Sequence, residues 1–221
     1  MTSLLLLYFF WSRWVSKYKG VLNQDKYASC FRVIHHEKGA DRRPANKFDL
    51  DIYGQTAPVL DYTVDPAVKQ ELVPVPFVQG AFAMVDVLSK SECAQIIAAA
   101  EAVGYAADEP AGASFSNGST GTGRAAALVW LADSSSLDPL YERCKPLLPQ
   151  ELGGGKLAGL NARWRLYRYG QEAVYRPHVD GAWPGSGIKD GILEYDAFGD
   201  RWSRLTFLLY LNDGKRERLS S

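Results

Sequence analysis

The sequence predicts an α+β protein in which the sheet carries the functional site. Residues 90–103 place apolar side chains at helical spacing, behind a Ser89–Glu92 capping box and ahead of Gly104. From Asn161 onward the apolar period switches to two, as in strands. A helical region followed by a strand-rich region is typical of α+β domains.

Residues 1–75 are expected to form an N-terminal extension that ends near Pro74 and Pro76, where proline favours extended chain. The apolar run LLLLYFFW at 4–11 is much shorter than the roughly 20 residues that span a bilayer as a helix. Basic residues follow this run, whereas a secretory signal has them in front. We therefore expect a buried or loosely packed helix here, with a short membrane anchor as the alternative.

The middle of the chain shows alternating strand, helix and loop patterns. The Gly- and Ser-rich run at 112–123 lacks the residue order of a phosphate-binding loop and does not open a helix, so we expect no nucleotide site there. Asp138 and Pro139 fit an N-cap and a first helical residue. The elements expected in this region are a strand at 81–87, a helix at 90–103, a strand at 125–131 and a short helix that begins at Pro139 and that Pro146 limits.

Two later strands have distinct faces. In the strand at 162–169, the odd-numbered residues, which include Tyr167 and Tyr169, share one face, and Trp164 and Leu166 share the other. A Gly- and Asp-containing insertion at 181–200 leads to a strand at 205–211. Thr206 and Tyr210 share one face of that strand.

The amino-acid composition bears on the class of binding partner and on the state of the cysteines. The 25 basic residues equal the 25 acidic residues, so net charge gives no case for nucleic-acid binding. Cys30, Cys93 and Cys144 are odd in number and widely spaced, and we expect buried thiols rather than a disulfide. The cysteines do not fix the compartment, so cytoplasmic and endomembrane locations both stay open.

The pair His178-x-Asp180 is the candidate metal site in this sequence. Side chains two apart on a strand point to one face, so an imidazole nitrogen and a carboxylate oxygen would share one ion. They make up two thirds of the 2-His-1-carboxylate set that holds non-haem Fe(II). The other histidines, His35 and His36, lie far upstream in charged, turn-rich sequence. As neighbours on a strand they would point to opposite faces, so at most one would reach the pair.

The segments YRYGQEAVYRPHVDGAWPGSG and SRLTFLLYLND resemble the Fe(II)- and 2-oxoglutarate-dependent dioxygenases of the prolyl 4-hydroxylase-like branch. The resemblance covers roughly 77–213. It implies a double-stranded β-helix, or jelly roll, packed against supporting helices such as 90–103. It also implies iron held by His178 and Asp180, 2-oxoglutarate as co-substrate, and room for ascorbate as a further cofactor.

The resemblance gives roles to two tyrosines. It implies that Tyr169 faces the iron and the co-substrate, and that Tyr210 hydrogen-bonds the distal carboxylate of 2-oxoglutarate. The alternative for both is an aromatic side chain packed on a sheet face. Trp183 and Trp202 flank the insertion, where each would cover a pocket or, more simply, anchor the loop.

The sequence departs from the family after its second motif. Members continue with a Gly-Gly turn, further strands, a distal histidine and an Arg or Lys that pairs with the co-substrate, whereas this sequence reads LNDGKRERLSS. We therefore expect residues 76–221 to be the N-terminal part of a dioxygenase domain, a partial jelly roll with impaired activity.

The alternative is a non-catalytic binding or interaction module. A cupin-type enzyme would supply more histidines. The sequence leaves two classes of acceptor open, a protein side chain and a small molecule.

Overall fold

A computed structural model describes residues 2–12, 24–42, 45–63, 70–107, 125–169 and 179–212. Three α-helices and two short 3₁₀ helices occur in these ranges: α1 Gln24–Ala28, η1 Gly39–Asp41, α2 Lys90–Val103, α3 Ser134–Cys144 and η2 Lys145–Leu147. The strands of the same ranges are β1 Thr2–Ser12, β2 Phe31–Glu37, β3 Leu50–Gln55, β4 Glu71–Pro74, β5 Phe82–Val85, β6 Ala106–Ala107, β7 Ala125–Leu131, β8 Glu151–Leu152, β9 Gly155–Leu160, β10 Arg163–Tyr169, β11 Gly187–Lys189, β12 Ile192–Glu194 and β13 Arg201–Tyr210. The described fold is α+β and consists mostly of strands, as expected.

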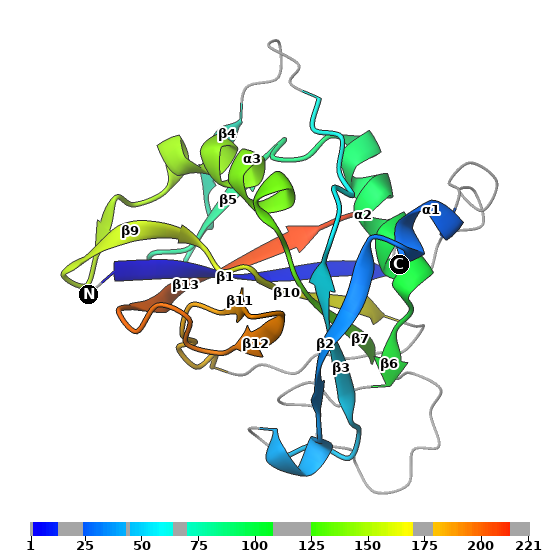
Figure 1. Ribbon diagram of the computed structural model, residues 1–221. Helices are drawn as coiled ribbons and strands as arrows, with labels where there is room; N and C mark the ends of the chain where they lie inside the picture. Colours follow the sequence, from blue (N-terminus) through cyan, green and yellow to red (C-terminus); the bar gives the residue numbers. More distant parts are fainter. Residues whose placement is uncertain are drawn as a thin grey trace, which may run out of the picture.

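One large sheet dominates the fold. Within the described ranges nine strands join it, in the order β2-β3-β7-β10-β1-β9-β8, with β13 paired to β1 and β6 paired to β7. Helices α2 and α3 lie on one side of this sheet, and the β11–β12 hairpin lies on the other (Figure 1). Strands β4 and β5 form a separate hairpin.

Strand β1 occupies the middle of the sheet. It runs parallel to all three of its partners: β9 pairs with Thr2–Leu5, β10 pairs with Tyr8–Ser12, and β13 pairs with Thr2–Phe10. Because residues 8–10 pair with both β10 and β13, these two strands lie on opposite edges of β1. In the described part of the chain, β13 therefore joins the sheet only through β1.

The apolar run at 4–11 lies in this strand, so the expected N-terminal helix is wrong. Leucine-rich sequence has good intrinsic helix propensity, but strands on both edges give the backbone hydrogen-bond partners that override it. Among the residues described, no helix is long and apolar enough to cross a membrane.

The range expected as an N-terminal extension contributes to the same sheet. Strands β2 and β3 pair antiparallel, and β3 pairs parallel with β7. Ile34 and Ile52 are buried in a cluster with Val129 of β7. Strands β2 and β3 are short and contain charged and polar residues, so no sustained period runs through this range of the sequence.

Helix α2 begins and ends where the sequence predicts. The Ser89 hydroxyl accepts a hydrogen bond from the Glu92 amide at 3.2 Å, and the Glu92 carboxylate accepts one from the Ser89 amide at 2.8 Å. Gly104 ends the helix at a φ of 94°, a backbone conformation open to glycine. The buried face of the helix, including Ile96 and Ala99, packs into the main core.

Helix α3 begins five residues before the expected start. Its N-cap is Asp133, whose carboxylate accepts a hydrogen bond from the Ser136 amide at 3.2 Å, and Pro139 lies inside the helix. A carboxylate at the N-cap satisfies an amide that has no partner within the helix, so Asp133 sets the start. The expected cap at Asp138 is therefore wrong.

A buried ion pair joins the two helices. The Arg143 guanidinium of α3 donates two hydrogen bonds of 2.8 Å to the Glu92 carboxylate of α2. The Thr63 amide donates a third at 3.0 Å. Glu92 is fully buried. Burial alone would raise the pKa of Glu92, but the hydrogen bonds from Arg143, Ser89 and Thr63 together lower it.

The two faces of the sheet have separate cores. Trp164 and Leu166 of β10 pack with Phe207 and Leu209 of β13 beneath the helices, together with Trp130. Tyr167, next to Leu166, faces the other side and packs with Ala127. The alternation predicted for β10 is confirmed.

The cysteines are free thiols. Cys30 and Cys144 are buried and Cys93 is partly buried. Burial raises the pKa of the Cys144 thiol to about 12. Cys30 and Cys144 thus have the buried, unreactive setting that the sequence predicts.

Candidate functional site

Asp180 is the one expected metal ligand within the described residues, and strand β13 positions it. The Thr206 hydroxyl donates a 2.7 Å hydrogen bond to the Asp180 carboxylate. Thr206 is exposed on β13, where exposed and buried residues alternate. Asp180 is itself exposed. The carboxylate is therefore oriented by a rigid strand and stays accessible to solvent.

Tyr169 and Tyr210 lie on the same face of the sheet as Thr206. Leu166 and Leu209 are at one level, because both pair with Phe9 of β1, and both point into the core beneath the helices. The alternate residues of β10 and β13 must point the other way. Asp180, Tyr169 and Tyr210 thus share one face of the sheet, opposite the helices.

The two tyrosines differ in environment. Tyr169 is half-buried, and its ring lies 6.3 Å from that of Tyr167. Burial raises the pKa of Tyr169, with the neighbouring Tyr167 and Tyr210 acting in the same direction. Its hydroxyl therefore keeps its proton at neutral pH and can donate a hydrogen bond. Tyr210 is 71% exposed, so most of this residue faces solvent.

The segment after Asp180 is fixed to the sheet. The Trp183 amide donates a 2.8 Å hydrogen bond to the Ser203 hydroxyl, and the Ser203 amide donates one of 2.8 Å to the Trp183 carbonyl. The Asn161 side chain donates to the Pro184 carbonyl at 3.0 Å. The Trp183 side chain packs against Ala127 and Tyr167, which fits the simpler of the two roles weighed for it, an anchor of the loop.

A charged cluster that sequence reasoning missed lies next to this anchor. Arg163 is almost fully buried, 3.6 Å from the Glu37 carboxylate and 5.0 Å from the centre of the Trp183 ring. Burial lowers the pKa of Arg163. The Tyr195 hydroxyl donates to Glu37 at 2.9 Å. Burial, reinforced by Glu37, raises the pKa of Tyr195 to about 12.

The sequence offers a partial signal for this cluster. Arginines on the same strand face as the tyrosines are visible from the period of two, but the partner Glu37 lies far away in sequence. Only the β2–β3–β7–β10 strand order brings Glu37 to Arg163. The cluster supports the base of the loop that follows Asp180.

The described donors do not complete an iron site. His178 lies outside the described residues, and among those described no group of three His, Cys, Asp or Glu side chains is placed to hold a metal ion. His35 packs edge-on against Tyr195 at 5.9 Å, and both ring nitrogens of His36 face aspartates of the β3 region. Asp180 alone fits the expected role, so no catalytic step is assigned to iron.

Comparison with known proteins found no matching family model, curated protein or solved structure. The functional assignment therefore depends on the motifs and on the placement of these side chains.

Proposed function

We propose that this chain belongs to an Fe(II)- and 2-oxoglutarate-dependent dioxygenase that hydroxylates a C–H bond of a protein or small-molecule acceptor. The observation that carries the proposal is that Asp180, Tyr169 and Tyr210, three of the four residues implied by the resemblance, share one face of the sheet. In this proposal the sheet is part of a jelly roll, and its helix-free face is the inside of the site.

Each residue has a role that its environment supports. Asp180 is the carboxylate ligand, and Thr206 fixes its orientation, as partners of metal ligands commonly do. Tyr210, a largely exposed residue on the same face, hydrogen-bonds a carboxylate of 2-oxoglutarate. The half-buried Tyr169 keeps its proton, so it donates a hydrogen bond to a co-substrate oxygen rather than repelling it as a phenolate.

Metal binding is the direct test. Mn(II) replaces Fe(II) because it resists oxidation, prefers similar oxygen and nitrogen ligands, and is measured by electron paramagnetic resonance. We expect the chain to bind one Mn(II), and we expect 2-oxoglutarate to tighten that binding. Asp180→Asn should weaken it by about tenfold or more, since removing a ligand costs at least as much as removing the partner of a ligand.

The matched control is Asp61→Asn, which removes an exposed carboxylate elsewhere on the surface. It should bind Mn(II) like the unmodified chain. Equal binding by Asp180→Asn and the unmodified chain would contradict the proposal and favour a non-catalytic module. Succinate formation from 2-oxoglutarate, measured in parallel, separates a catalytic chain from one that only binds.

A further inference from the structure

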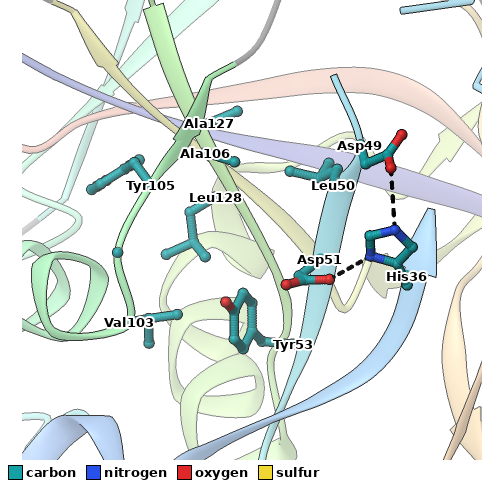
Figure 2. A pocket seen from close by; sticks show the side chains of 11 residues that line it. His36, Asp49, Leu50, Asp51, Tyr53, Val103, Tyr105, Ala106, Ala127 and Leu128 are labelled. Atoms are coloured by element: carbon teal, nitrogen blue, oxygen red, sulfur yellow. Dashed lines mark hydrogen bonds and ion pairs between the residues drawn. The ribbon is translucent and has the colours of Figure 1, made fainter. Parts of the chain in front are cut away.

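A pocket lies on the other side of the sheet, where the C-terminal end of α2 meets β2, β3 and β7 (Figure 2). Its volume is about 250 Å³. This exceeds the roughly 150 Å³ of a cavity that holds benzene, and it falls below the roughly 300–1,000 Å³ of pockets for larger molecules. The pocket therefore suits a ligand the size of one amino-acid side chain.

One end of the pocket is acidic. Figure 2 shows the Asp51 carboxylate between the His36 ring and the apolar side chains of Leu128 and Val103. His36 Nδ1 lies 2.8 Å from one Asp51 oxygen, and Nε2 lies 3.3 Å from an Asp49 oxygen. With both aspartates ionised, the three side chains carry a net negative charge whether the imidazole is neutral or protonated.

The end of helix α2 adds to this negative character. The pocket is lined by Val103, the last residue of α2, and by Gly104. The C-terminal end of a helix carries partial negative charge and favours cations, yet the last turn of α2 contains no basic residue. Glu101 in that turn is paired with Arg168 at 3.1 Å, so its charge is already balanced.

The remaining walls are apolar or aromatic. Leu128 of β7 lines one wall, and Tyr53 and Tyr105 add aromatic rings. The Arg168 guanidinium already lies 4.9 Å from the centre of the Tyr105 ring, which shows that this ring accepts a cation. An apolar and aromatic wall beside a carboxylate matches a ligand with an aliphatic stem and a cationic head.

We propose that this pocket binds an organic cation, an ammonium or guanidinium group on an aliphatic stem, with its head against Asp51 and its stem along Leu128 and Val103. Lysine and arginine side chains of a peptide and free alkylamines share this chemistry. The site is separate from the Asp180 face, because Leu128 and Tyr53 belong to the core beneath the helices. It therefore stands or falls independently of the dioxygenase proposal.

The test uses three small probes and the full chain. N-acetyl-lysine methylamide represents a peptide side chain, n-butylammonium represents a free amine, and N-acetyl-norleucine methylamide is the neutral match. We expect both cations, but not the norleucine compound, to shift the amide resonances of Gly104 and Ala106 in NMR titrations. Tighter binding of the lysine compound assigns the site to peptides, and tighter binding of butylammonium assigns it to free amines.

Two variants probe the two halves of the pocket. Asp51→Asn should weaken cation binding about tenfold or more, as loss of a charged hydrogen-bond partner does. Val103→Phe should fill the pocket and abolish binding without changing any charge. The control Asp138→Asn removes an exposed carboxylate from α3 and should leave binding unchanged.

Either of two results overturns the proposal. One is equal binding of the norleucine and lysine compounds, which would show that charge plays no part. The other is unchanged cation binding in Val103→Phe, which would place the cation elsewhere. If Asp51→Asn does not fold, as judged by circular dichroism, Val103→Phe and the neutral probe still decide the question.

Discussion

The Thr206 hydroxyl lies 2.7 Å from the Asp180 carboxylate and donates a hydrogen bond to it. The two residues belong to different motifs of the family resemblance, the PHxD segment and the T-x-x-x-YLN strand. Their contact fixes a loop carboxylate to the middle of β13. The orientation of the expected ligand thus depends on a strand that follows it by more than twenty residues.

Replacing Thr206 by Val should weaken metal binding. Valine keeps the shape of threonine but cannot donate to Asp180, and losing such a partner typically costs about 10- to 100-fold in metal affinity or activity. Mn(II) titration followed by electron paramagnetic resonance measures the change. Thr206→Ser retains a hydroxyl and should bind nearly as the unmodified chain does. An affinity in Thr206→Val equal to that of Thr206→Ser would remove Thr206 from the site.

Replacing Glu92 by Gln should destabilise the fold. The change leaves the Arg143 guanidinium, 15% exposed, without its ionised partner, and breaking a buried ion pair on one side costs about 3 kcal/mol. Urea denaturation at pH 7 measures the loss. The control Glu142→Gln removes a 65% exposed carboxylate next to Arg143 in helix α3. It should change the free energy of unfolding by less than about 0.5 kcal/mol. Similar losses of unfolding free energy in both variants would show that the buried Glu92–Arg143 pair stabilises the protein no more than an exposed pair does.

Acid should weaken the same pair. The pKa of Glu92 is lowered in the folded state from its ordinary value of 4.5, because hydrogen bonds from Arg143 and two amides outweigh the effect of burial. The stabilisation is therefore complete above pH 4.5 and is lost as the pH falls through the lower, folded-state pKa. Urea midpoints between about pH 6 and pH 3 should fall less steeply in Glu92→Gln than in the unmodified chain. Parallel curves would exclude Glu92 as a source of acid sensitivity.

His36 should titrate above its ordinary pKa of 6.5. The hydrogen bond to Asp51 is the main cause, desolvation of the imidazole acts against it, and the hydrogen bond to Asp49 adds to the rise. Asp51→Asn should lower the His36 pKa more than Asp49→Asn does, because the contact with Asp51 is 2.8 Å and that with Asp49 is 3.3 Å. The shift of the imidazole protons with pH reports both values.

The raised pKa of His36 makes the stability of the protein depend on pH. A raised folded-state pKa means that the His36 interaction stabilises the protein fully below pH 6.5 and is lost as the pH rises through the folded-state pKa. A His36 pKa that is the same in all three proteins would contradict the bridging role of this imidazole.

A proline in the middle of β1 should open the sheet. Phe9 pairs with Leu166 on one edge and with Leu209 on the other, and proline cannot donate to a strand ladder. Phe9→Pro should lower the melting temperature and expose strand edges that promote association, seen by light scattering after gel filtration. Thr2→Pro, at the first residue of the strand, should be tolerated. Equal melting temperatures would show that β1 does not hold β10 and β13 together.

Local sequence patterns correctly predicted those elements whose determining residues lie close together in the sequence. The Ser89–Glu92 capping box and Gly104 gave both ends of α2, because all the groups involved lie within one turn of the helix ends. The faces of β10 followed from its period of two. The expected start of α3 was wrong because contacts outside the helix favour Asp133 as its N-cap instead of Asp138. Gln55 of β3 donates to Asp133 at 2.8 Å and to Ser136 at 2.9 Å.

Features made by distant segments were not predictable from local pattern. The apolar run at 4–11 fits a buried strand as well as a buried helix, and its partners in β9, β10 and β13 decide in favour of the strand. The pocket beside α2 has a weak signal, the alternation of Asp49, Asp51 and Tyr53. Its histidine arrives through the β2–β3 register, in which His36 pairs with Asp51.

The parallel pairing of β1 has a consequence for folding kinetics. Thr2 pairs with Arg201, so β1 emerges from the ribosome long before its partner β13 exists. Contacts between such distant segments slow folding, and an apolar strand that waits for its partners is exposed to chaperones and to self-association. We therefore expect the pairing of β1 with β13 to be the slowest step, the one that completes the sheet.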